Sequence, residues 1–425
     1  MINDILYKRT TEAPDKIFLY YNNAEYTYVR FNRIVNSISF LLTEKYSKKF
    51  LNIKIQNKLF FFATIMACNR SGKIPVLISE NNMEATDIDD KVVEKIKITD
   101  KTIDYTGNSY NENDIQAVVF SSGTTGSPKG AELTFNNFYQ NSIMWNEVFK
   151  FNSDDVYLNI LPINHVGGLC IMFRALYNNF PVQIDNYSLH FLDSFNNKRC
   201  THVSLVPSML YDIISNNLVE NFKNIKKMIL GGSNINSNIL EKSIKLKLPI
   251  FIVYGMTETC SGIAGASINQ SNYNKYKYSP FRNVYISVDN LQICIKSPTV
   301  MKKYYKSSAS IVSFTTSDLG DVDEIGDFRI NGRSDSVIIS GGEIFSIDLI
   351  EKAVNKVGKV NRCRVIGVED EKWGQRTIAF IETDNKSINR EYIFEAIKNE
   401  IDRKMIPRDI YIVSDIDKIN TNLYL

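Results

Sequence analysis

The chain has 425 residues, of which 44% are hydrophobic and 23% charged, and its formal net charge is +3. This length exceeds what one hydrophobic core usually serves, so we expect two or more domains. Basic and acidic residues are interleaved, which gives no indication of nucleic-acid binding. We expect no integral membrane segment because no apolar run is long enough, and a cytoplasmic location because the first residues lack the order of a signal peptide.

Short apolar, β-branched runs alternate with helix-length segments through the first three quarters of the chain. This order predicts parallel sheets built from βαβ units. The predicted strands are residues 117–120, 156–161, 201–206, 227–230 and 250–254. Residues 279–330 follow with short alternating strands, for example 290–295, which predicts a β-rich subdomain.

The last part of the chain shows a compact α+β pattern. Its predicted elements are a strand at 337–339, a helix at 346–357, strands at 362–368 and 377–382, a helix at 389–404 and a strand at 410–413. The predicted fold class is therefore α/β. A large N-terminal domain, residues 1–334, has parallel-rich sheets with helices plus the β-rich subdomain. A small, mobile α+β domain, residues 335–425, begins at a hinge near Asp335.

Cysteine and histidine are too dispersed to indicate a metal centre. The six cysteines contain no CxxC pair, which argues against a zinc site and a disulfide framework, so we expect reduced thiols. The three histidines, His165, His190 and His202, are scattered. Any metal is expected to be magnesium that arrives with a nucleotide.

A run of small residues with one lysine follows the predicted strand 117–120. Its members are Ser121, Ser122, Gly123, Thr124, Thr125, Gly126, Ser127, Pro128, Lys129 and Gly130. Backbone N–H groups in such a run can approach an anion closely, and the hydroxyls and Lys129 add donors. The run therefore predicts a phosphate-binding loop. It is not a Walker A loop, because Pro128 precedes the lysine and Gly130 follows it. A flexible polar turn is the alternative on this run alone.

Three further motifs carry groups suited to a nucleotide. Tyr254-Gly-Met-Thr-Glu-Thr259 follows a predicted strand, where open α/β sheets bind ligands; Tyr254 can stack on a purine and Glu258 can hold magnesium. Asp318 can accept hydrogen bonds from ribose hydroxyls, and Arg333 can donate to phosphate or ribose oxygens. The glycines of Ser340-Gly-Gly-Glu343 allow close backbone approach to a ligand. Taken singly, each motif is also compatible with an ordinary loop or turn.

Together and in this order, the motifs resemble the acyl-adenylate-forming, or AMP-binding, enzyme superfamily, which includes acyl- and aryl-CoA synthetases. The resemblance covers nearly the whole chain. It extends over Leu161-Pro-Ile-Asn-His165, Gly231-Gly-Ser233, Gly332-Arg-Ser-Asp335, Gly367-Val-Glu-Asp-Glu-Lys-Trp-Gly-Gln375 and Ile406-Pro-Arg408. Among the subfamilies, the ligases that activate 2-succinylbenzoate look most similar, on the His165 segment, residues 203–210 and the Trp373 segment. Other small CoA ligases share these segments.

The resemblance implies a two-step reaction. A small carboxylic acid and ATP, with Mg²⁺, give an acyl-AMP and pyrophosphate, and a thiol then displaces AMP. The thiol belongs to CoA or to the pantetheine of an acyl carrier protein. The resemblance does not determine which acid is activated.

The resemblance also implies roles for single residues. The β- and γ-phosphates would be held by Ser121, Ser122, Gly123, Thr124, Thr125, Gly126 and Lys129. Thr257 and Glu258 would serve the α-phosphate and magnesium. The adenine pocket would be lined by Gly231, Gly232, Ser233 and Tyr254, and Gly255 would also belong to the nucleotide-binding residues.

Asp318 would bind the ribose, with Arg333 beside it, and His165 would guard the carboxylate pocket. The implied catalytic residues are Lys129, His165, Thr257 and Glu258. Gly341 and Gly342 would line the pantetheine tunnel.

The chain departs from the family at its adenylation lysine. Alignment from Ile406-Pro-Arg408 puts Asn422 at the family's glycine and Leu423 at the lysine, and Lys418 is not a clear replacement. Losing one such preorganised donor costs about 10²- to 10³-fold in rate. Three functions therefore stay open: an acid–thiol ligase with a weakened first step, an enzyme that makes thioesters from a preformed acyl-adenylate, and a non-catalytic nucleotide-binding relative.

Overall fold

The fold is taken from a computed structural model of the chain. It describes residues 1–78, 85–96, 109–121, 128–195, 199–233, 235, 237–334, 336–340, 343–358, 360–383, 385, 387–398, 400–401 and 405–419. Several predicted site residues lie outside the described residues: Ser122, Gly123, Thr124, Thr125, Gly126, Asp335, Gly341, Gly342, Asn422 and Leu423.

A six-stranded sheet carries the predicted phosphate loop. Its order is β19-β9-β8-β5-β4-β6. Strands β4 (Phe50–Lys54), β5 (Ile74–Leu77), β6 (Ile88–Asp89) and β8 (Ile115–Phe120) run parallel. Strand β9 (Gly130–Thr134) returns antiparallel to β8, and β19 (Lys303–Tyr304) adds antiparallel to β9 from much later in the chain.

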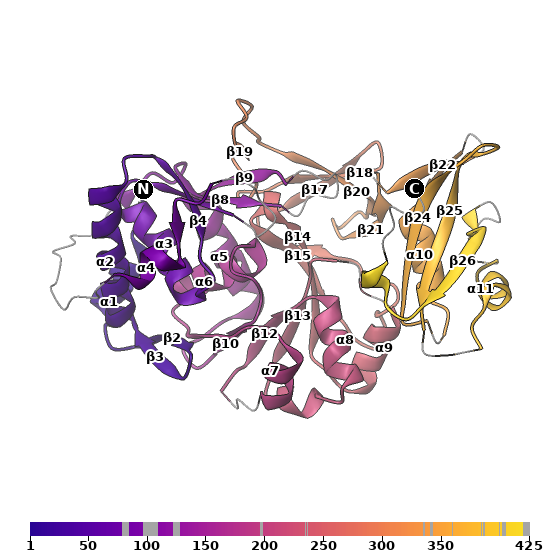
Figure 1. The fold of residues 1–425 in the computed structure, drawn as a ribbon, viewed down its shortest axis with the longest axis horizontal. Coiled ribbons are helices and arrows are strands. Elements are labelled where there is room, and N and C mark those ends of the chain that lie inside the picture. Colours follow the sequence, from indigo (N-terminus) through magenta and orange to yellow (C-terminus); the bar gives the residue numbers. More distant parts are fainter. Residues whose placement is uncertain are drawn as a thin grey trace.

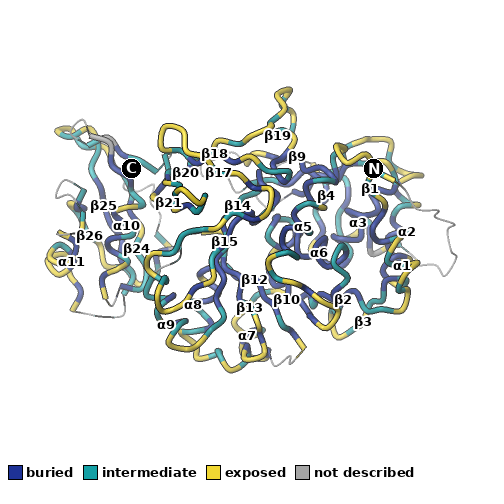
Figure 2. The backbone as a smooth tube through the Cα atoms, turned by 180° about the vertical axis from the view of Figure 1, so that it is seen from behind, coloured by how far each residue is buried: buried dark blue, intermediate teal, exposed yellow. Residues whose placement is uncertain are grey.

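A nine-stranded sheet forms the second layer, in the order β16-β15-β14-β13-β12-β10-β11-β2-β3. Its central strands are parallel, as predicted: β2 (Ile17–Tyr21), β11 (Val182–Ile184), β10 (Tyr157–Asn159), β12 (His202–Leu205), β13 (Lys227–Leu230) and β14 (Ile250–Met256). Antiparallel strands complete its edges: β3 (Ala24–Thr27), β15 (Ser261–Ser267) and β16 (Ser279–Pro280). Figure 2 shows the strands β12 and β13 buried in the interior.

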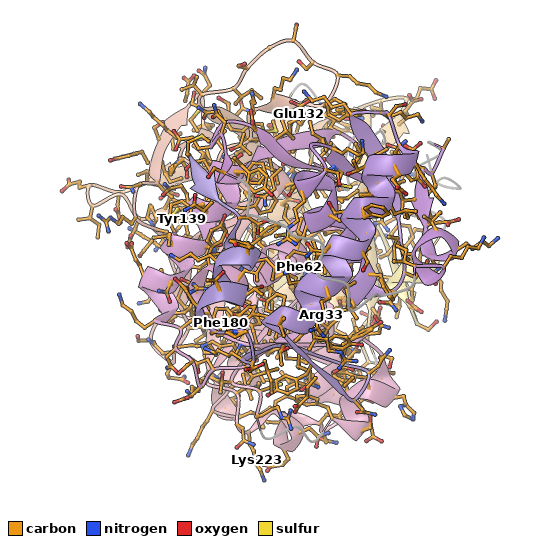
Figure 3. All side chains as sticks on the ribbon, turned by 90° about the vertical axis from the view of Figure 1, so that its left-hand side faces the viewer. Arg33, Phe62, Glu132, Tyr139, Phe180 and Lys223 are labelled. Atoms are coloured by element: carbon orange, nitrogen blue, oxygen red, sulfur yellow. The ribbon has the colours of Figure 1, made fainter. Side chains whose placement is uncertain are left out.

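Helices pack on and between these sheets. The helices of the larger part are α1 (Ile5–Glu12), α2 (Tyr28–Lys45), α3 (Lys58–Arg70), α4 (Asp90–Glu94), α5 (Phe135–Phe149), α6 (Val166–Asn178), α7 (Leu189–Ser194), α8 (Pro207–Ser215) and α9 (Ser237–Lys245), with a 3₁₀ turn at Val219–Phe222. Helix α3 is apolar on nearly every side, which is typical of a buried helix. Its Phe62 contacts Phe18, Phe31 and Phe173 at ring-centroid distances of 5.2–6.3 Å. Figure 3 shows Phe62 among the central helices and Lys223 at the periphery.

A buried arginine joins α5 and α6 to the second sheet. The Arg174 guanidinium lies 3.3 Å from the Trp145 ring centroid and donates to Asn141 Oδ1 at 2.8 and 3.0 Å and to Ser261 Oγ at 3.0 Å. On the same helix, Cys170 Sγ lies 3.8 Å from Cys260 Sγ. All six cysteines are free thiols, as predicted.

The β-rich segment forms a separate four-stranded antiparallel sheet. Its strands are β17 (Tyr285–Asp289), β18 (Gln292–Lys296), β20 (Phe314–Val322) and β21 (Phe328–Arg333). The prediction of a β-rich subdomain is confirmed. A small pairing of β1 (Ile2–Asn3) with β7 (Ser109–Tyr110) lies apart from it.

The C-terminal part is an α+β unit at one end of the molecule (Figure 1). Its elements are β22 (Val337–Ser340), β23 (Glu343–Ser346), α10 (Ile347–Asn355), β24 (Arg362–Asp370), β25 (Gly374–Glu382), α11 (Arg390–Ile397), β26 (Asp409–Val413) and a 3₁₀ turn at Ile416–Lys418. Its helices and strands surround a core of their own, which includes Val354, Ile381 and Ile393. Among the described residues, no helix combines the length and apolarity needed to cross a bilayer.

Several predicted elements are shorter in the structure, two of them markedly. The strand predicted at 156–161 is limited to β10, because the Leu161 carbonyl accepts from Lys58 Nζ at 3.1 Å instead of continuing the ladder. The helix predicted at 389–404 is limited to α11, which begins at Arg390 and ends at Ile397, while residues 399 and 402–404 of the predicted range lie outside the described residues. Ile401 then packs against the C-terminal core.

Candidate functional site

Two strand ends meet where the adenine pocket is predicted. Gly231 and Gly232 directly follow β13, which pairs in parallel with β14. A Cβ on Gly231 would lie 2.8 Å from Val253 Cγ2, and Gly232 has φ +89°. Both positions therefore favour glycine, and the loop through Ser233 packs against the end of β14.

A buried carboxylate joins β14 to the β-rich sheet. The Tyr254 hydroxyl donates to Asp318 Oδ2 at 2.6 Å, and Arg333 Nη1 donates to Oδ1 at 3.0 Å. Asp318 and Arg333 are register partners across β20 and β21. Burial, followed by the neighbouring Asp318 carboxylate, raises the pKa of Tyr254 well above its ordinary value, so its hydroxyl stays a donor. These contacts fix the orientation of the Asp318 carboxylate.

The aromatic ring of Tyr254 packs against two other rings. Its centroid lies 5.3 Å from that of Phe328 and 5.7 Å from that of Tyr278. Its hydroxyl points to the carboxylate predicted to bind ribose. Stacking of Tyr254 on a purine stays a prediction.

A tight turn presents Thr257 and Glu258. The pairing of β14 with β15 shifts register between Tyr254 and Gly255, and a Cβ on Gly255 would lie only 2.2 Å from the Ser261 carbonyl oxygen. The 3₁₀ turn Thr257–Thr259 follows. The Met256 N–H donates to Thr259 Oγ1 at 3.0 Å, and that hydroxyl donates to the Ser261 carbonyl at 2.9 Å. The half-buried Thr257 and the buried Glu258 therefore sit on a well-braced backbone.

Glu258 is linked to the phosphate-loop lysine through Tyr304. The Tyr304 hydroxyl donates to Glu258 Oε1 at 3.0 Å, and Lys129 Nζ lies 5.6 Å from the Tyr304 ring centroid. The ends of the predicted phosphate loop are also joined, because the Ser121 N–H donates to the Lys129 carbonyl at 3.0 Å. The structure thus brings Lys129 and Glu258 into contact with the same side chain, that of Tyr304. Tyr304 had no place in any sequence motif.

A single carboxylate is a suitable protein ligand for magnesium. Mg²⁺ takes oxygen ligands, keeps several waters and binds proteins through one or two carboxylates together with substrate phosphates. Glu258 supplies such a carboxylate, and Lys129 contacts the same tyrosine, Tyr304, so these groups fit a magnesium ion bound with a nucleotide. In the described part of the chain, no group of three or more His, Cys, Asp or Glu side chains could hold a metal ion.

His165 occupies the N-cap position of α6. Its N–H donates to the Pro162 carbonyl at 3.3 Å, and its carbonyl accepts from the Leu169 N–H at 2.9 Å. Burial lowers the pKa of the imidazole, which keeps the ring neutral near pH 7. In the described structure, none of these contacts reaches Glu258 or Asp318. Helix α6 nevertheless contacts the residue that follows the Thr257–Thr259 turn, because Cys170 Sγ lies 3.8 Å from Cys260 Sγ.

The small unit carries a recess of its own. It is lined by Ile338, Ser340, Trp373, Arg376, Thr377, Ile406 and Arg408. The Arg408 guanidinium lies 5.0 Å from the Trp373 ring centroid. Arg376 forms ion pairs with Asp409 and, at 3.5 Å, with Asp370. The Gly367–Gln375 and Ile406–Arg408 segments thus meet at one surface.

Two family models match the chain. Residues 80–305 match the family described as AMP-binding enzyme, and residues 349–422 match the AMP-binding enzyme C-terminal domain. The 2-succinylbenzoate–CoA ligase of Staphylococcus epidermidis is 30% identical over 336 residues, which cover 75% of this chain and 70% of that protein. The corresponding ligase of Staphylococcus aureus strain JH9 is 32% identical over 281 residues, 63% of this chain. That match spans 57% of the Staphylococcus aureus protein, less than two thirds of its length.

Solved structures share the fold. The o-succinylbenzoate CoA synthetase of Bacillus subtilis, in complex with the acyl-adenylate intermediate OSB-AMP, has a TM-score of 0.84 and 23% identity. The match covers 97% of this chain and 95% of that one. The same enzyme in complex with ATP and magnesium has a TM-score of 0.83 and 22% identity, and covers 97% and 96%. The α/β fold with a large N-terminal and a small C-terminal part is therefore shared with these structures.

Proposed function

Because this chain belongs to the AMP-binding enzyme family, we propose that it is an ATP-dependent acid–thiol ligase. A carboxylate oxygen of the acid attacks the α-phosphorus of ATP, and pyrophosphate leaves. The thiol sulfur then attacks the carbonyl carbon of the acyl-AMP, the C–O bond to AMP breaks, and a thioester forms.

The observation that carries this proposal is the pair of contacts at the two ends of the Tyr254–Glu258 segment. At one end, Tyr254 and Arg333 hold the Asp318 carboxylate, which would accept hydrogen bonds from the ribose. At the other, Tyr304 joins Glu258 to Lys129, where the phosphates would lie. Magnesium, when bound, would neutralise phosphate charge there. One short segment thus faces both ends of a nucleotide.

The remaining predicted residues take supporting roles in this proposal. Ser121 and Lys129 hold the β- and γ-phosphates, together with loop residues 122–127. Thr257 serves the α-phosphate, and Gly231, Gly232, Ser233 and Gly255 allow the adenine to approach the backbone. His165, neutral because it is buried, borders the carboxylate pocket.

We propose 2-succinylbenzoate as the acid and CoA as the thiol. Both compounds occur in the names of the Staphylococcus relatives. The matches to this chain cover 57–70% of the length of those proteins. An acyl carrier protein is the competing thiol donor. A cytoplasmic location and a boundary between residues 334 and 335 remain proposals as well.

The two other functions are less well supported. Both rest on Leu423, which stands where the family has its adenylation lysine and lies outside the described residues. The residues that would serve ATP lie in two groups: Arg333 contacts Asp318 directly, and Lys129 and Glu258 each contact Tyr304. They favour a complete ligase.

Acid-dependent exchange of labelled pyrophosphate into ATP tests the proposal. We expect exchange with 2-succinylbenzoate, but not with benzoate or a fatty acid, followed by a thioester with CoA. Exchange should be slow, and Leu423→Lys should accelerate it. Thioester formation with a carrier protein but not with CoA would contradict the choice of thiol.

Two outcomes would contradict the complete ligase. If no acid supports exchange while supplied acyl-AMP is converted rapidly to a thioester, the chain performs the second step alone. If ATP binds while neither step occurs, it is a nucleotide-binding relative.

A further inference from the structure

Tyr304 lies between two groups that the proposed function places at the phosphates. Its hydroxyl donates to Glu258 Oε1 at 3.0 Å, and its ring centroid lies 5.6 Å from Lys129 Nζ. The second distance is within the range of a cation–π contact. One side chain therefore contacts both the predicted magnesium ligand and the predicted phosphate lysine.

The backbone around Tyr304 is held on both sides. Tyr304 pairs with Ala131 in β9, the strand that begins directly after Lys129. The neighbouring N–H groups of Lys302 and Tyr305 donate to the carbonyls of Glu132 at 2.9 Å and Gly130 at 2.7 Å. The Met301 N–H donates to the Glu258 carbonyl at 2.8 Å. The segment 301–305, which contains β19, is thus hydrogen-bonded both to β9 and to the turn that carries Glu258.

The hydroxyl of Tyr304 is suited to remain a donor. A phenolic hydroxyl has an ordinary pKa of about 10, so it keeps its proton near neutral pH. A donor on Oε1 restricts rotation of the carboxylate and leaves the lone pairs of Oε2 as the second acceptor. Partners of this kind orient metal ligands.

We propose that Tyr304 is a positioning residue for the nucleotide-bound magnesium. Its hydroxyl orients Glu258 towards the metal, and its ring supports the Lys129 ammonium, so that the two groups keep a fixed separation. This inference rests on the proposed function of the same site.

Tyr304→Phe tests the hydroxyl while keeping the ring. We expect the variant to bind Mn²⁺ about 10- to 100-fold more weakly in the presence of ATP, because outer partners of metal ligands have effects of this size. Mn²⁺ binding is measured by electron paramagnetic resonance, without acid or thiol. Binding of ATP in the presence of EDTA should be unchanged, because Lys129 keeps its aromatic contact. The Mg²⁺ concentration for half-maximal pyrophosphate exchange should rise by the same factor.

Tyr305→Phe is the matched control. It changes the neighbouring tyrosine, whose ring packs on Phe50 at a centroid distance of 5.4 Å. We expect its Mn²⁺ affinity to equal that of the wild type. Tyr304→Leu removes the ring as well and should also weaken ATP binding in EDTA. Thermal melting of each variant reports whether it folds.

A double-mutant comparison separates an effect through Glu258 from general damage to the fold. In a Glu258→Gln background, Tyr304→Phe should change Mn²⁺ affinity no further, since the carboxylate it positions is gone. Wild-type Mn²⁺ affinity in Tyr304→Phe, or an undiminished effect of Tyr304→Phe in the Glu258→Gln background, would overturn the inference. Failure of the wild type to bind Mn²⁺ with ATP would instead contradict the proposed function, and this inference with it.

Discussion

Asp318 is the residue on which the proposed contact with the ribose depends. Its side chain is buried, and donors from β14 and β21 hold both carboxylate oxygens. Its own N–H donates to Thr316 Oγ1 at 2.9 Å, which fixes the backbone as well. A carboxylate held in this way needs little reorganisation to accept hydrogen bonds from a ribose.

Replacing Asp318 by Asn should weaken ATP binding about 10- to 100-fold. Hydrogen bonds to a charged group contribute about 1.5–3 kcal/mol, and the amide cannot accept on both sides. Isothermal titration with ATP measures the change. Asp321→Asn is the control, because Asp321 lies on the same strand, is exposed and contacts Asn331 at 3.0 Å. Equal ATP affinity in the two variants would contradict the ribose role of Asp318.

His202 makes the stability of the fold dependent on pH. Burial lowers its pKa from the ordinary 6.5 to about 4, while Asp155 opposes this change and Lys226 and Lys227 favour it. Between these values the unfolded chain binds a proton that the folded chain does not. The free energy of unfolding therefore falls as the pH drops from 6.5 towards 4, by about 3 kcal/mol from this residue. In urea unfolding at several pH values, His202→Gln should show a shallower fall than the wild type. Parallel curves would show that His202 does not titrate in this way.

At the scale of elements, the strands β14 and β15 shape the proposed nucleotide site. After a register shift between Tyr254 and Gly255 the two strands stay paired as far as Met256, and the 3₁₀ turn that carries Glu258 follows directly. The two strands approach so closely there that a Cβ on Gly255 would overlap the Ser261 carbonyl oxygen.

Gly255→Ala should therefore destabilise the fold by about 1–3 kcal/mol and also weaken ATP binding, because the added methyl group separates the strands at the turn. Urea unfolding and ATP titration measure the two effects. Gly358→Ala is the control, since a Cβ at this exposed position meets no atom within 4 Å. An ATP affinity unchanged by Gly255→Ala would show that the turn tolerates the displacement.

The sequence predicted the central elements well because their pattern follows from burial. Residues 227–230 match β13, and the run at 250–254 begins β14, since strands covered on both faces need continuous apolar residues. The family resemblance predicted Arg333 beside Asp318, but the strand pattern alone could not, because the pairing of β20 with β21 shifts register between Leu319 and Gly320.

Tyr304 was missed for a related reason. Strand β19 has only two residues, too few to show periodicity, and pairs with a strand far earlier in the chain.

At the scale of the whole molecule, the small unit touches the large one through α10 (Figure 1). Lys352 Nζ donates to the Ile330 carbonyl at 2.9 Å, and Asn238 Nδ2 of α9 donates to the Asn355 carbonyl at 3.0 Å. If the small unit turns about Asp335 between the two half-reactions, these bonds must break in one of its orientations.

A cross-link between α9 and α10 should therefore separate the half-reactions. Asn238→Cys combined with Asn355→Cys, joined by a short thiol-specific reagent, should lose overall thioester synthesis. It should keep either pyrophosphate exchange or thioester formation from supplied acyl-AMP. The untreated double variant is the control. Full turnover in the cross-linked protein would contradict a rotating small unit.

The buried Arg174 has a consequence for how sequence variants of this protein should be read. Arg174 and Asn141 bind the first residues of β15, and the Trp145 indole N–H donates to the Gly262 carbonyl at 2.8 Å. These residues come directly after the turn that carries Glu258. In a mutational screen for catalysis, replacing Trp145 or Asn141 should lower activity as replacements in the proposed nucleotide site do. Both residues are nevertheless buried residues of helix α5. A loss of activity in such a screen would then identify residues that hold the turn in place as well as residues that contact the substrate.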